Sequence, residues 1–130
     1  MAITVSWDNE QKTIISQVFN PPWDWEDFLA AFKRVAELAG EVDYEVSMIS
    51  DMGGIEQVPA NAIMSGSRAI SPIPSNVVLC VLIAPSRLMV SLIKIMQSMT
   101  HYNKITTAST IERAQLLIGL KIAAHPLTSY

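Results

Sequence analysis

The chain has 130 residues, the length of one ordinary domain, and is long enough to bury a core without disulfides or metal ions. Half of its residues are hydrophobic and only 16% are charged, which excludes an intrinsically disordered chain. The net charge of −3 combines an acidic first part with a basic second part, but the basic residues are scattered without interleaved aromatics. We therefore expect a single domain over residues 1–130 that does not bind nucleic acid.

The N-terminal residues predict a β-hairpin. Residues 2–7 alternate between polar and apolar side chains, which is the period of a strand with one buried face. The polar residues 8–11 supply a turn, and residues 13–19 have the pattern of a second strand. We expect the two strands to pair, with the first strand at one edge of the sheet.

A clearly delimited helix is predicted to follow the hairpin. Asp24 is a candidate N-cap, and apolar residues then recur at helical spacing as far as Ala39. Trp23 can pack on Phe28 as a hydrophobic staple, and Gly40 is well placed to end the helix.

The remaining sequence alternates strands with helices. Strands are predicted at residues 44–52, 76–84 and 104–108, and helices at 59–69, at 85–100 and after the capping box Ser109–Glu112. The strand at 76–84 is apolar on both sides, which is typical of a central parallel strand covered on both faces. This order predicts an α/β domain with a mostly parallel sheet of four or five strands, an antiparallel N-terminal edge strand and about four helices.

The most apolar stretch, residues 77–99, is too interrupted to span a membrane. Pro85 and Arg87 break it after the strand and Lys94 breaks it again, whereas a span needs about twenty predominantly apolar residues. Met1 leads directly into the first strand pattern without a secretory leader. We therefore expect a cytoplasmic protein with no membrane span.

Five short motifs are spread over nearly the whole chain. They are Trp7-Asp8 in the hairpin, Pro-Pro-Trp-Asp-Trp-Glu-Asp-Phe at 21–28, Ile-Ser-Asp-Met at 49–52, the strand end Ala84-Pro85-Ser86, and Ser-x-x-Glu-Arg-Ala at 109–114. Together they resemble the SpoIIAA-like, or STAS-like, family. The resemblance implies a small α/β domain related to anti-sigma-factor antagonists, a group that acts in protein–protein regulation and usually without catalysis.

One of these motifs departs from the pattern of the phosphorylated antagonists. They carry Asp-Ser-Ser-Gly, with the switch serine at a helix start, where this chain has Asp51-Met52-Gly53-Gly54. Met52 and Gly53 cannot accept phosphate. Ser50 lies within the predicted strand, where we expect its hydroxyl to be packed or hydrogen-bonded. We therefore expect a constitutive protein that is not switched by serine phosphorylation.

Polar residues are predicted to gather at the carboxyl edge of the sheet, where open parallel sheets bind their ligands. The candidate residues of this ligand edge are Asp51, Ser86, Arg87 and Thr107. A helix N-terminus nearby would favour an anion. The simpler interpretation is that Ser86 is an N-cap and Asp51 a strand-end residue.

Catalytic and metal-binding chemistry has little support in the sequence. His101 and His125 are far apart, with no carboxylate at ligand spacing. Cys80 is the single cysteine, which excludes an internal disulfide, and it lies in an apolar run where a thiol is usually inert. No nucleophile is paired with a base. We expect a protein that is not an enzyme and has no cofactor or metal.

The predicted helix at 85–100 has a wider apolar arc than packing on one sheet face requires. The arc covers about half of the circumference at ~100° per residue, and it contains methionines, which suit adaptable binding surfaces. The last helix shows a similar excess. We therefore expect a homodimer, or a complex with another protein partner, through Met89, Ile93, Met96, Leu116 and Leu120.

The same apolar arc is compatible with two alternatives to an interface. Residues 125–130 could fold back over it. Alternatively, the domain could bind a lipid or another hydrophobic ligand, with the methionine-rich helix as one wall of a pocket and Arg68, Arg87 or Lys94 beside an acidic headgroup.

Overall fold

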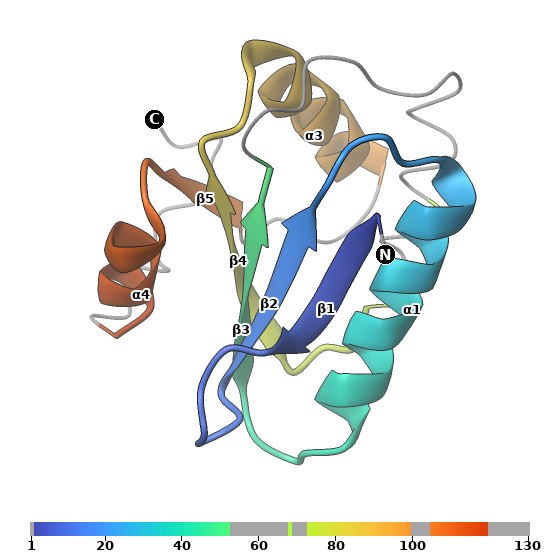
Figure 1. The fold of residues 1–130 in the computed structure, drawn as a ribbon. Helices are drawn as coiled ribbons and strands as arrows, with labels where there is room; N and C mark the ends of the chain where they lie inside the picture. The colour runs from blue at the N-terminus through green and yellow to red at the C-terminus, as the bar shows by residue number, and fades with distance from the viewer. Residues whose placement is uncertain (1, 53–67, 69–72, 100–104, 120–130) are drawn as a thin grey trace.

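The computed structural model describes residues 2–52, 68, 73–99 and 105–119. Five strands form one sheet in the order β1-β2-β3-β4-β5 (Figure 1). Their bounds are Ile3–Trp7 (β1), Ile14–Phe19 (β2), Val46–Asp51 (β3), Val77–Ile83 (β4) and Ile105–Ala108 (β5). β1 pairs antiparallel with β2, and the other neighbouring strands are parallel. The predicted α/β class, with a mostly parallel sheet and an antiparallel N-terminal edge strand, is confirmed.

Helices lie on both sides of this sheet. They are α1 (Trp25–Gly40), α3 (Arg87–Met99) and α4 (Ile111–Gly119). α1 and α3 pack on one face, and α4 packs on the opposite face (Figure 1). The helix predicted at 59–69 lies outside the described residues, except that Arg68 is helical.

Two hydrophobic cores result, one on each face of the sheet. The core of the α1/α3 face is the larger, and it includes Cys80 and Leu82 of β4. The core of the α4 face includes Val81 and Ile83 of the same strand. β4 therefore buries both of its sides, which confirms the prediction for this strand and explains its unbroken apolar sequence.

The start of α1 is fixed by a reciprocal capping box. The Asp24 carboxylate accepts the backbone N–H of Asp27 at 2.8 Å, and the Asp27 carboxylate accepts the N–H of Asp24 at 3.0 Å. The Trp23 and Phe28 rings stack with their centroids 5.5 Å apart, as the staple predicts. The helix ends at Gly40, also as predicted.

The start of α4 differs by one residue from the prediction. The hydroxyl of Thr110, and not that of Ser109, accepts the backbone N–H of Arg113, at 3.1 Å. The predicted Ser109–Glu112 capping box is therefore wrong, because helix formation begins at Ile111 and places Thr110 at the N-cap.

Candidate functional site

The predicted ligand edge does not assemble into one cluster. Asp51 shares the side of β3 that carries Ile49, which packs on the α4 face. Thr107 is paired with Leu82, whose side chain lies on the α1/α3 face. Because side chains alternate along a strand, Asp51 and Thr107 lie on opposite faces of the sheet.

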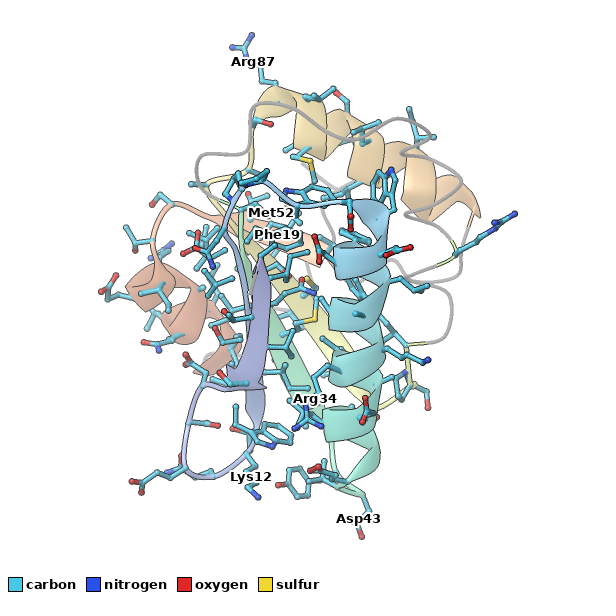
Figure 2. The ribbon with its side chains drawn as sticks, turned by 45° about the vertical axis from the view of Figure 1, so that its right-hand side comes forward. Lys12, Phe19, Arg34, Asp43, Met52 and Arg87 are labelled. Atoms are coloured by element: carbon cyan, nitrogen blue, oxygen red, sulfur yellow. The ribbon has the colours of Figure 1, made fainter. Side chains whose placement is uncertain are left out.

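The other two residues of that edge act at the start of α3. The Ser86 hydroxyl accepts the backbone N–H of Met89 at 3.2 Å, so Ser86 is the N-cap of this helix. Arg87 is exposed, and Figure 2 shows its side chain pointing away from the sheet. The simpler interpretation of Ser86 is confirmed, and the convergence of these residues on one ligand is corrected.

The α3 residues predicted to form an interface are divided between the core and the surface. Met89 and Ile93 are 2% and 4% exposed and belong to the core of the α1/α3 face. Their predicted place on an exposed surface is therefore wrong, because this side of α3 packs on the sheet. The exposed apolar residues are Leu88 at 45% and Ile95 at 44%, with half-buried Leu92 between them.

The remaining predicted interface residues do not join this surface. Leu116 is 48% exposed, but it belongs to α4, on the other face of the sheet from α3 (Figure 1). One flat interface cannot include both helices. The side chain of Met96 and all of Leu120 lie outside the described residues.

The structure also bears on the predicted lipid pocket, which was to have α3 as one wall. Met89 and Ile93 are buried in the core of the α1/α3 face. Arg68, Arg87 and Lys94 are all exposed. The burial of Met89 and Ile93 gives the lipid hypothesis no support, and it stays a prediction.

A buried polar pair crosses from β2 to β3 on the α1/α3 face. Gln17 and Ser50 are fully buried, and the Ser50 hydroxyl donates a hydrogen bond of 2.9 Å to the Gln17 side-chain oxygen. The Gln17 Nε2 has no hydrogen-bond partner among the described residues. The packed, hydrogen-bonded Ser50 confirms the prediction. Gln17 was missed, although it stands at an inward position between Ile15 and Phe19.

Cys80 extends this polar pair to β4. Its Sγ lies 3.8 Å from the Ser50 hydroxyl. Burial raises the pKa of the Cys80 thiol to about 12, and the hydrogen bond with Ser50 lowers it by a smaller amount. The thiol is therefore protonated at neutral pH and is shielded from solvent, so it is a packed group and a poor nucleophile, as predicted.

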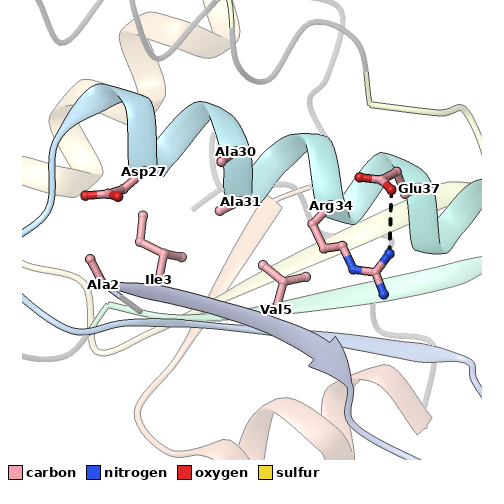
Figure 3. Close-up of a pocket in the computed structure, with 8 residues that line it drawn as sticks. All are labelled: Ala2, Ile3, Val5, Asp27, Ala30, Ala31, Arg34 and Glu37. Carbon is pink, nitrogen blue, oxygen red and sulfur yellow. Dashed lines mark ion pairs between the residues drawn. The ribbon is translucent and has the colours of Figure 1, made fainter.

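A groove of about 400 Å³ lies between β1 and α1, and we call it the β1–α1 groove (Figure 3). It is lined by Ala2, Ile3, Val5, Asp27, Ala30, Ala31, Arg34 and Glu37. Two alanines of α1 keep this flank of the helix narrow, and the aliphatic side chains come from the strand. Arg34 and Glu37 form an exposed ion pair at 3.6 Å at one end of the groove. Sequence patterns contain no sign of this groove, because it depends on how α1 sits over the edge strand.

Within the described residues, no helix has both the length and the apolar character needed to cross the lipid bilayer. In the same part of the chain, no three His, Cys, Asp or Glu side chains gather closely enough to hold a metal ion.

Comparisons of the chain with protein-family models, with curated proteins and with solved structures find no match. The STAS-like resemblance therefore stays a prediction.

Proposed function

We propose that this chain is a non-catalytic protein-interaction module that forms a homodimer through the outer side of α3. The observation that carries the proposal is the apolar stripe of Leu88, Leu92 and Ile95. These residues are spaced by four and three positions, so they follow one side of the helix. Leu88 and Ile95 each leave nearly half of their surface exposed, on the side of the helix next to the buried side of Met89 and Ile93.

The size of the stripe suits a weak to moderate dimer. Full burial of a leucine or isoleucine side chain contributes about 1.5–3 kcal/mol. Leu88 and Ile95 have 45% and 44% of their surface left to bury, so the two copies together could gain roughly 3–5 kcal/mol from these four side chains. That gain offsets only part of the entropy of association, so rim contacts must add to it. A micromolar dissociation constant corresponds to about −8 kcal/mol, so these rim contacts must contribute more than the stripe itself.

The test compares two leucine-to-glutamate variants with matched exposure. Leu88→Glu places a charge in the proposed interface, whereas Leu116→Glu places the same charge on α4, on the other face of the sheet. Sedimentation velocity at tens of micromolar should show a dimer for the wild type and Leu116→Glu, and a monomer for Leu88→Glu. A monomeric wild type at this concentration would contradict the proposal, and loss of the dimer only in Leu116→Glu would move the interface to α4.

A further inference from the structure

We propose that the β1–α1 groove binds an extended segment of a partner protein, which adds to the sheet as a sixth strand beside β1. The groove contains neither Leu88 nor Ile95, so this site is separate from the proposed dimer interface. The proposal rests on the backbone of β1, on the shape and charge of the groove, and on the position of α1.

The hydrogen-bonding phase of β1 leaves one set of backbone groups directed away from β2. The N–H of Asn20 donates to the carbonyl of Ala2 at 2.6 Å, and the N–H of Asp8 donates to the carbonyl of Ile14 at 2.7 Å. In an antiparallel pair, hydrogen-bonded and non-hydrogen-bonded positions alternate. The even-numbered residues of β1 therefore bond to β2, and Ile3, Val5 and Trp7 direct their N–H and C=O groups outward.

These outward groups define what can bind. Among the described residues, β2 is the one strand that pairs with β1. A row of backbone donors and acceptors at strand spacing is matched by another extended backbone, which is how peptide-binding domains extend a sheet. A compact ligand could satisfy one or two of these groups but not the row.

The groove provides room for the side chains of the added strand. Ile3 and Val5 point into it from β1, and Ala30 and Ala31 face them from α1 (Figure 3). Its volume of about 400 Å³ is within the range of binding clefts. Every second side chain of an added strand would point to this face. We therefore expect small or branched apolar residues at alternate positions of the bound segment.

The charges of the groove indicate a basic residue in the partner segment. Asp27 and Glu37 contribute two carboxylates, and Arg34 contributes one guanidinium, which already pairs with Glu37. Asp27 stands beside Ile3, at the opposite end of the groove from that pair (Figure 3). A lysine or arginine at the end of the segment that lies near Asp27 would complement it.

A second copy of this chain fits the edge less well than a separate segment. α1 lies over β1, as Figure 3 shows. Pairing β1 with its copy about a two-fold axis would set the strands about 4.8 Å apart and place a second α1 over the same edge. Packed helices need about 8–10 Å between their axes. A segment without an overhanging helix avoids this clash.

The first measurement uses the whole chain, labelled with ¹⁵N, and two synthetic peptides of seven residues. One peptide has lysine at position 1 and valine at positions 3, 5 and 7, so that these side chains point to one face of the added strand. The other peptide has glutamate in place of the lysine. We expect saturable shift changes in β1 and on the groove side of α1, with weaker binding of the glutamate peptide by about two- to fivefold. Bound peptide should slow hydrogen exchange at the Ile3 and Val5 amides by at least tenfold, with little change at Thr4.

Two pairs of variants test the position of the bound segment. Val5→Pro removes an outward N–H without removing a hydrogen bond to β2, whereas Val5→Ile keeps that N–H. Ala30→Trp fills the groove, whereas Leu29→Trp adds the same ring at an exposed position of α1 that does not line it. We expect at least tenfold weaker binding for Val5→Pro and Ala30→Trp, and unchanged binding for both controls, with the fold of each variant checked by its amide spectrum.

Three results would overturn the proposal. The first is no saturable binding of either peptide, and the second is binding that Val5→Pro and Ala30→Trp leave unchanged. The third is slow exchange at Ile3 and Val5 in the free chain, because it would show that the edge is already paired. If that protection increases with protein concentration, the edge is paired with a second copy. None of these results depends on whether the Leu88→Glu substitution dissociates the proposed α3 dimer.

Discussion

Replacing Ser50 with alanine should destabilise the fold, although the change removes a single oxygen atom. The Ser50 hydroxyl is the hydrogen-bond donor to the Gln17 side-chain oxygen at 2.9 Å, and both residues are fully buried. In the Ser50→Ala variant, the Gln17 carboxamide would lose its hydrogen bond at oxygen, while its Nε2 has no partner among the described residues. A buried polar group left unsatisfied costs about 1–3 kcal/mol.

The size of this effect can be separated from simple loss of packing by a second substitution. Gln17→Met keeps a long side chain of similar shape but removes both polar atoms. Introduced together with Ser50→Ala, it should recover most of the lost stability, because replacing both partners by apolar groups is nearly neutral. The double variant should then be more stable than Ser50→Ala alone.

Urea unfolding of the wild type, both single variants and the double variant provides the measurement. We expect Ser50→Ala to lower the free energy of unfolding by about 1–3 kcal/mol and the double variant to lie within about 1 kcal/mol of the wild type. A loss below about 0.5 kcal/mol for Ser50→Ala would refute the reasoning, since surface-like substitutions have effects of that size. Additive losses in the double variant would refute it equally.

Four further results are expected. Asp24→Ala should lower the free energy of unfolding by about 1 kcal/mol, because it removes the capping box of α1. Thermal melts followed by circular dichroism test this, with Asp43→Ala, at an exposed position, as the control. Cys80 has its pKa raised from 9.0 to about 12, so the unfolded chain loses the thiol proton first; stability should fall by about 1.4 kcal/mol per pH unit between about pH 9 and 12, and Cys80→Ala should lack this component. Met89→Glu should unfold the chain and not merely dissociate the dimer, because the Met89 side chain is buried in the core. Denaturant unfolding should show a much lower stability for Met89→Glu than for Leu88→Glu. Phosphopeptide mapping should find no phosphate on buried Ser50, and stoichiometric phosphate coupled to partner binding would contradict the expectation of a constitutive protein.

The fold could be predicted where local patterns and tertiary packing agree. The alternation in β1 and β2, the Asp24 cap of α1 and the two-sided apolar sequence of β4 each specify one structure, and each was confirmed. The one-residue error at the start of α4 has a simple cause. Ser109 and Thr110 are both good N-caps, so composition cannot decide between them.

The surface of α3 could not be predicted because the helix is apolar on several sides. Its sequence shows an excess of apolar residues but not which of them face the sheet. Met89 and Ile93 occupy the buried side, and Leu88 and Ile95 the exposed side. That choice is made by the packing of α3 against the core of the α1/α3 face, which includes residues distant in sequence.

The prediction of the ligand edge was wrong for a different physical reason. Asp51 and Thr107 both stand at strand ends, but the face on which each side chain lies depends on strand register. Asp51 pairs with Ile83 of the α4 face and Thr107 with Leu82 of the α1/α3 face, and the sequence does not reveal these pairings. The β1–α1 groove escaped prediction because it needs the relative position of two elements.

Self-association through α3 is tested most directly by isotope-filtered NMR on a mixture of labelled and unlabelled chain. The methyl groups of Leu88 and Ile95 should show nuclear Overhauser contacts with protons of a second copy, whereas the methyls of Leu116, on the opposite face, should show none. A wild-type chain without intermolecular contacts at Leu88 and Ile95, at concentrations up to its solubility, would contradict the proposed function.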